Sequence, residues 1–194
     1  MFSIAFLNFD EADRNYDPCV DISICPITCD SHKKAAASLE RMGYRQNPEL
    51  GLWAGSSATS SSICHAFITE NASAPERAQS KKRIRITITA TFNISTESGS
   101  RRCSLGPTPL DMSFDTPEEA ENFFQEKGYK PDTDNLEVMS KPLANEGGIT
   151  GIALAVISQP TEQSAAIMYN QGLSYESITA VLEQSIKIIK KLTV

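Results

Sequence analysis

The chain is poor in the residues and motifs that carry most enzyme chemistry. Its 194 residues include only two histidines, His32 and His65. It contains no Walker loop, no G-x-G-x-x-G, no H-E-x-x-H and no G-x-S-x-G sequence, so common signatures of nucleotide binding, zinc proteolysis and serine hydrolysis are missing. We therefore favour a non-catalytic protein over an enzyme and expect no cofactor.

Long apolar runs and an excess of positive charge are missing too. The longest apolar segment, residues 148–157, is much shorter than the ~20 residues of a membrane span. The chain has 18 basic and 24 acidic residues and a net charge of −6, which argues against nucleic-acid or anionic-membrane binding. Residues 1–9 resemble no signal peptide. We expect a soluble cytoplasmic protein, with a mature secreted form as the open alternative.

The chain has five cysteines, which are Cys19, Cys25, Cys29, Cys64 and Cys103. An odd number leaves at least one unpaired, and we expect reduced thiols. Cys25, Cys29 and His32 lie at a predicted helix start, where a thiol can be activated or a zinc ion held. Because C-x3-C-x2-H is not an established zinc spacing, we expect no metal site and keep these three residues as the alternative.

One pattern occurs twice along the chain. Residues 30–45 and 115–130 share the template D-[ST]-x3-A-x3-[LF]-x3-G-Y-[RK], at a constant offset (115 − 30 = 85 and 128 − 43 = 85). The hydroxyl residue suits a helix N-cap, and the Gly-Tyr pair suits a Schellman ending. The template predicts helices at about 31–42 and 116–127. Both internal duplication and two independently well-capped helices explain it.

Apolar and alternating segments predict strands around these helices. The expected strands are 2–9, 20–27, 50–54, 63–69, 83–95, a segment near 136–140, 149–158 and 165–169. An apolar stripe predicts a last helix over 174–192. The fold class is therefore α+β, with a predominantly antiparallel sheet, two α-β-β-β modules and a C-terminal helix. We expect the N-terminal strands and first module in 1–96, a Gly- and Pro-containing connection in 97–110, and the second module in 111–194, in one compact domain or two.

The clearest strand, 83–95, supplies the candidate binding residues. One parity is apolar and is predicted to face the core, namely Ile84, Ile86, Ile88, Ala90, Phe92 and Ile94. The other parity is predicted to face water or a partner. The candidate partner-binding residues on it are Arg83, Arg85, Thr87, Thr89 and Thr91.

The leading functional hypothesis is a non-catalytic protein-binding module of the immunity-protein, inhibitor or secretion-chaperone kind. Its partner would be another protein, and homodimer formation is a further option. Two alternatives remain open, namely a small-ligand-binding domain and a thiol- or metal-dependent enzyme that uses Cys25, Cys29 and His32.

The C-terminal half also shows a resemblance to a known family. A helix that ends in Glu126-Lys127-Gly128-Tyr129, several strands, and Gly172-Leu173-Ser174-Tyr175 before a long final helix are similar in element order to type III secretion chaperones. The resemblance covers the second module and the C-terminal helix and includes no specific motif. The long N-terminal half departs from the compact size of that family. The resemblance implies chaperone-like binding of another protein.

Overall fold

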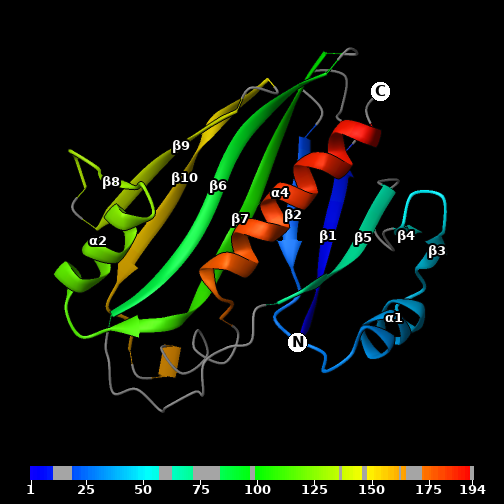
Figure 1. The fold of residues 1–194 in the computed structure, drawn as a ribbon, viewed down its shortest axis with the longest axis horizontal. Helices are drawn as coiled ribbons and strands as arrows, with labels where there is room; N and C mark the ends of the chain where they lie inside the picture. Colours follow the sequence, from blue (N-terminus) through cyan, green and yellow to red (C-terminus); the bar gives the residue numbers. More distant parts are fainter. Residues whose placement is uncertain are drawn as a thin grey trace.

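The computed structural model describes residues 1–10, 19–56, 63–71, 84–96, 99–135, 137–145, 148–161, 163–164 and 172–192. These residues form one large sheet with helices packed on it (Figure 1). The strands are β1 (Phe2–Asp10), β2 (Cys19–Ile24), β3 (Arg45–Asn47), β4 (Leu52–Ser56), β5 (Ile63–Glu70), β6 (Ile84–Thr96), β7 (Gly99–Phe114), β8 (Lys130–Pro131), β9 (Val138–Asn145) and β10 (Ile149–Ser158). The helices are α1 (His32–Arg41), α2 (Pro117–Glu126) and α4 (Tyr175–Leu192). The expected strand at 165–169 lies outside the described residues.

The ten strands lie in the order β3-β4-β5-β1-β2-β7-β6-β10-β9-β8. Every pairing is antiparallel except that of β2 with β7, which is parallel and joins the two halves of the sheet. The predicted fold class, an α+β protein with a mostly antiparallel sheet and a C-terminal helix, is confirmed.

Both halves of the sheet pair their strands in the same order. In the first half β1 lies between β2 and β5, and β4 and β3 follow outward. In the second half β6 lies between β7 and β10, and β9 and β8 follow. In each half, two strands precede the helix and three follow it. The predicted α-β-β-β modules therefore leave out the two strands before each helix. Internal duplication itself stays a prediction.

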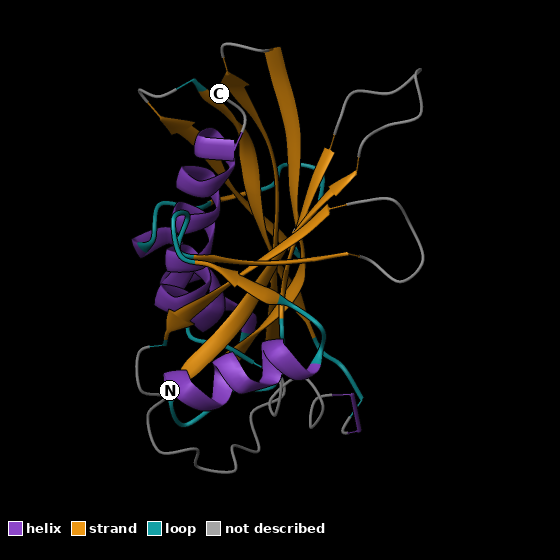
Figure 2. Ribbon diagram, turned by 90° about the vertical axis from the view of Figure 1, so that its right-hand side faces the viewer, coloured by secondary structure: helices purple, strands orange, loops and turns teal. Residues whose placement is uncertain are grey.

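The helices lie on opposite faces of the sheet. Strand side chains alternate between the two faces, and Leu7, Phe67 and Phe92 share one apolar cluster with buried residues of α2 and α4. Their strand neighbours of the other parity, Ile4 and Ala66, share a second cluster with α1. We name the face under α2 and α4 the inner face and the opposite one the outer face. Figure 2 shows the helices beside the strands.

The ends of α1 and α2 form as their sequences predict. The Oγ of Ser31 accepts a hydrogen bond from the Lys34 N–H (3.3 Å), and the Oγ1 of Thr116 accepts one from the Glu119 N–H (3.2 Å). These bonds satisfy donors that the first helical turn leaves unpaired. Within the described ranges, no helix is both long and apolar enough to cross a membrane.

The predicted connection over 97–110 is wrong, because residues 99–110 belong to β7. Their prolines and glycines suggested a loop. The register between β6 and β7 shifts between Ile88 and Ala90, where Gly106 and Pro107 lie opposite a single β6 residue. Such a bulge leaves residues outside the hydrogen-bonded ladder, so a proline there loses no ladder bond.

The chain enters α4 along β7. A Cβ added to Gly172 would lie 2.4 Å from the backbone oxygen of Leu110, so only glycine allows this approach. Leu173 then donates its N–H to the Pro109 oxygen at 3.0 Å and forms a parallel bridge with Leu110. This bridge fixes the start of α4 beside the central strands.

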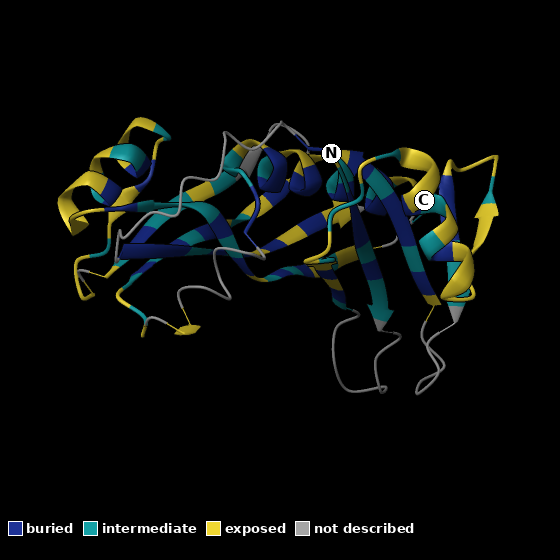
Figure 3. Cartoon of the chain, turned by 90° about the horizontal axis from the view of Figure 1, so that it is seen from below, coloured by how far each residue is buried: buried dark blue, intermediate teal, exposed yellow. Residues whose placement is uncertain are grey.

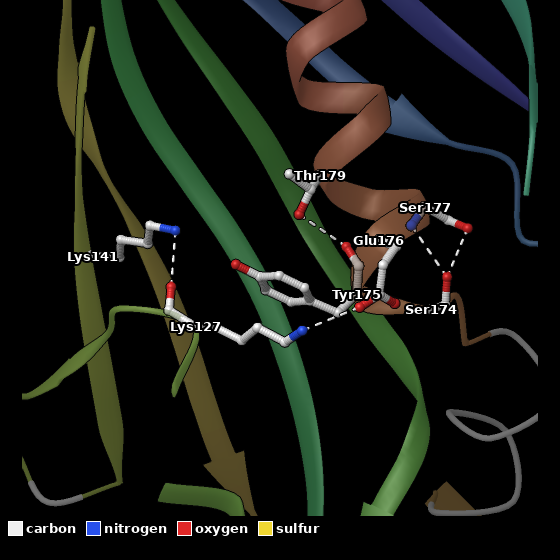
Figure 4. Close-up of polar contacts among 7 residues, drawn as sticks. All are labelled: Lys127, Lys141, Ser174, Tyr175, Glu176, Ser177 and Thr179. Atoms are coloured by element: carbon white, nitrogen blue, oxygen red, sulfur yellow. Dashed lines mark hydrogen bonds and ion pairs between the residues drawn. The ribbon is translucent and has the colours of Figure 1, made fainter. Parts of the chain in front are cut away.

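Side-chain contacts join the start of α4 to the end of α2 (Figure 4). The Oγ of Ser174 accepts a hydrogen bond from the Ser177 N–H at 3.1 Å and caps α4. The Nζ of Lys127 lies 3.3 Å from a Glu176 carboxylate oxygen and 5.3 Å from the centre of the Tyr175 ring. The ion pair and the cation–π contact hold the two helices together on the inner face.

Candidate protein-binding face

The apolar side of β6 is the centre of the core. Ile84, Ile86, Ile88, Ala90, Phe92 and Ile94 are all buried, each with an exposed fraction of 5% or less. They contact the cluster that contains α2 and α4. The predicted alternation of this strand is confirmed, and its opposite parity therefore lies on the outer face.

The outer face of the second half of the sheet is open to solvent over its central strands. β6 contributes Thr87, Thr89, Thr91 and Asn93, β10 contributes Thr150, Ile152, Leu154 and Val156, β9 contributes Val138, Ser140 and Pro142, and β7 contributes Ser104. We name this set the open face. Exposed and buried residues alternate along the strands in Figure 3. Among the described helices, α1 covers the first half of the outer face, and α2 and α4 cover the inner face.

Ile152 lies at the centre of the open face. It pairs with Thr91 on β6 and with Pro142 on β9, and all three are exposed. The Ile152 side chain remains 41% exposed although both neighbouring strands are present.

The residues named as the open face are uncharged, but two exposed basic residues pair with them on the same face: Arg102 of β7 with Asn93, and Lys130 of β8 with Ser140. The apolar members of the open face are Ile152, Leu154, Val156, Val138 and Pro142, and the others have hydroxyl or amide groups. An acidic residue lies at its border with the first half. There the Ser104 hydroxyl donates a hydrogen bond to an Asp21 carboxylate oxygen at 2.5 Å.

The predicted binding residues differ in their exposure. Arg83 lies outside the described residues, and Arg85 is buried, with 4% exposed, so it does not face a partner as expected. Thr87 and Thr89 are half-buried, and the Thr89 hydroxyl donates to the Leu105 backbone oxygen at 2.7 Å. Thr91 is exposed. Exposure on this face therefore increases along β6, from the buried Arg85 to the exposed Thr91 and Asn93.

Sequence reasoning missed the contribution of β10. Its apolar run predicted a strand but not which of its residues would be uncovered, and the structure exposes Ile152 and Thr150. The missing information was the pairing of β10 with β6, which places these residues on the uncovered face. In the sequence, only the alternation of threonines in β6 indicated this face. It did not show which strands lie beside β6.

The residues of the alternative thiol or metal site lie elsewhere, beside β1. The Cys25 N–H donates to the Ile4 oxygen at 2.8 Å, and Cys29 forms a backbone bridge with Phe2. The His32 ring meets the Phe2 ring edge-on, 6.0 Å between centres. In the part of the chain that the structure describes, no group of three or more His, Cys, Asp or Glu residues is placed to hold a metal ion.

Cys64 and His65 are adjacent in β5 and therefore lie on opposite faces of the sheet. Tyr44 donates its hydroxyl hydrogen to the Cys64 Sγ at 2.9 Å on the outer face. Burial raises the pKa of the Cys64 thiol, and the hydrogen bond from Tyr44 opposes that shift. Burial lowers the pKa of His65, which contacts Phe9 on the inner face. A protonated thiol and a histidine on opposite faces do not form a nucleophile–base pair.

The free edges of the sheet are poor templates for an added strand. The edge strands β3 and β8 have three and two residues. The part of β9 that β8 does not cover contains Pro142, which has no N–H to donate. It also contains Lys141, whose ammonium donates a hydrogen bond to the Lys127 backbone oxygen at 2.9 Å. Short edges, proline and lysine are common protection against strand addition, so the open face is the stronger binding candidate.

Comparison of the chain with protein-family models, with curated proteins and with solved structures found no match.

Proposed function

We propose that this protein is a non-catalytic protein-binding module of the immunity-protein, inhibitor or secretion-chaperone kind, and that its open face contacts the partner. The observation that supports this most is the exposure of Ile152, 41%, on a strand with neighbours on both sides. Uncovered apolar surface on a sheet face is typical of a binding site, because burying it releases about 25 cal/mol per Å².

The composition of the open face supports a protein as the partner. Nucleic acids and anionic membranes are bound by clusters of Lys and Arg, and the open face has no such cluster, although Arg102 and Lys130 lie at its borders. Hydroxyl and amide groups around an apolar centre match the apolar core and polar rim of protein interfaces. Thr91 and Asn93 supply such polar groups beside Ile152.

Paired variants test this proposal through partner capture from an extract of the native host. Ile152→Asp and Thr91→Asp place a charge on the open face, so a protein captured by the wild type should be lost with both variants. Ile63→Asp is the matched control, because Ile63 is also an exposed isoleucine of a strand, with 51% exposed, at the far end of β5. Unchanged capture by both open-face variants would contradict the proposal.

The same variants separate a foreign partner from a second copy of the chain. Light scattering of the purified wild type measures the oligomeric state directly. A dimer that becomes monomeric with Ile152→Asp would show that the open face joins two copies, and the heterologous-partner proposal would then be wrong.

A further inference from the structure

The two halves of the sheet match residue by residue in their strand pairing. One row of paired residues crosses each half, namely Leu7, His65, Ala54 and Arg45 in the first half and Thr89, Leu154, Ser140 and Lys130 in the second. Each row ends on the basic residue that directly follows the Gly-Tyr pair of its helix. We call residues at the same place in the two halves counterparts. The match in register holds whether or not the halves arose by duplication.

Counterparts lie on opposite faces of the sheet. The halves meet at the parallel pairing of β2 with β7, which are themselves counterparts. A half-turn about an axis along the strands keeps the strand directions and exchanges the two faces. The helices agree with this relation, since α1 lies on the outer face of the first half and α2 on the inner face of the second. The inner face of the first half therefore corresponds to the open face.

The helix α4 covers that inner face. It contacts β5, β6 and β7, and Figure 1 shows it lying across the central strands. Beneath it Leu7 is fully buried, whereas the counterpart Thr89 is half-buried and Thr91, two residues further on, is exposed. The corresponding place on the outer face holds no helix of the described residues. The open face is thus the place where an amphipathic helix lies on the other side of the molecule.

The exposed Met42 marks the start of that place. Lys127 is the C-cap of α2, and its side chain contacts Tyr175 and Glu176 at the start of α4. Its counterpart at the same offset (127 − 42 = 85) is Met42, the C-cap of α1. The Met42 side chain is 51% exposed. An apolar side chain is therefore uncovered where its counterpart contacts the covering helix.

Arg102 marks the other end. α4 ends close to the C-terminal end of β1, and Leu192 and Phe9 pack against one cluster there (Figure 1). The corresponding place is the C-terminal end of β6, where Asn93 pairs with the exposed Arg102. No ion pair between described residues involves Arg102. A cation beside a helix C-terminus is favourable, because the free carbonyl groups there carry partial negative charge.

We infer that the partner presents an amphipathic helix to the open face, docked as α4 docks on the inner face. Its N-terminal end lies at Met42, its C-terminal end lies at Arg102, and its apolar side faces Leu154 and Ile152. The inference rests on the proposed function and adds which kind of partner element the face binds. A helix suits this place better than a strand, because the sheet edges that would receive a strand are short and protected.

Crosslinks from both ends of the path test this inference in the native host. Benzoylphenylalanine is placed at Met42 in one variant and at Thr91 in another, and the attachment sites on the captured protein are identified by peptide mass analysis. The 18 residues of α4 span about 27 Å. We expect both variants to attach to one segment of one protein, roughly 15 residues apart, with the Met42 site first. An extended segment would give sites about 8 residues apart.

The outcomes separate the inference from the proposed function. Sites at the extended spacing, in two different segments, or in the reverse order would overturn the helix, while the binding function of the open face would stand. A complex from Thr91 without one from Met42 would do the same. The absence of any complex from Thr91 would overturn both.

Substitutions at the two ends test the same path by capture from a host extract. Met42→Asp and Arg102→Glu should each lower recovery of the captured protein about tenfold or more. The matched controls are Leu50→Asp, at an apolar residue that is 43% exposed, and Arg45→Glu, at an exposed arginine of β3. Both controls should capture as the wild type does, and melting temperatures check that all four variants fold. Unchanged recovery with both end variants, or equal loss with the controls, would overturn the inference.

Discussion

Gly43 and Gly128 have the same left-handed backbone conformation, with φ values of +87° and +86°. Each directly follows the C-cap of its helix. The next residue closes the same hydrogen bond in both cases, from the Tyr44 N–H to the Leu39 oxygen at 3.0 Å and from the Tyr129 N–H to its α2 carbonyl at 2.9 Å. Both helices therefore end in the Schellman motif that the repeated template predicts.

Replacing either glycine should therefore cost stability through the backbone alone. We expect Gly43→Ala and Gly128→Ala each to lower the free energy of unfolding by about 1 kcal/mol, because alanine resists positive φ. A Cβ at Gly43 would meet nothing within 4 Å, so no clash contributes there. Urea unfolding measures the loss, and Gly43→Asn should lose less because asparagine tolerates this conformation better. Equal stability of Gly43→Ala and the wild type would contradict the motif.

Gly151 should be intolerant of substitution for a different reason. A Cβ there would lie 2.3 Å from the Cβ of Phe92 on the neighbouring strand. We expect Gly151→Ala to separate β6 from β10 and to cost roughly 1–3 kcal/mol. Gly106→Ala is the control, because its nearest contact would be the Ile22 oxygen at 3.9 Å. Similar melting temperatures of the two variants would show that β6 and β10 do not pair in this register.

The two faces of β6 should respond differently to a new carboxylate. Ile86→Asp buries an unpaired charge in the core and should cost several kcal/mol, a large part of the ~5–15 kcal/mol of a typical domain. Thr91→Asp faces solvent and should change the free energy of unfolding by less than about 0.5 kcal/mol. Thermal unfolding of both variants checks this. Equal destabilisation would mean that the threonine face is not open.

Cys103 should make the fold sensitive to high pH. Burial raises the pKa of its thiol from 9.0 to about 12, partly offset by the Arg101 charge. A thiol whose pKa is higher in the folded than in the unfolded state stabilises the fold. That contribution is fully present below the pKa of the unfolded state and is lost as the pH rises through the pKa of the folded state. Between pH 9 and 12 the wild type should lose up to about 1.4 kcal/mol per pH unit more than Cys103→Ala. Urea unfolding across this range measures the difference, and parallel curves would contradict it.

Local sequence patterns predicted the elements whose cause is local. The alternation of β6 and the caps of α1 and α2 depend on residues within a few positions of each other. The strand assignment of β7 failed because the bulge that accommodates Pro107 forms only against β6. The burial of Arg85 and the exposure of Ile152 depend on which strands and helices cover them, and no local pattern contains that information.

The most direct test of the binding face is a photo-crosslink from its centre. A benzoylphenylalanine placed at Thr91 projects from the open face beside Ile152, and the same residue at Ile63 serves as the control. After irradiation in the native host, the account predicts a covalent complex with a different protein from position 91 and none from position 63. A complex from position 63 alone, or from position 91 with only a second copy of this chain, would contradict it.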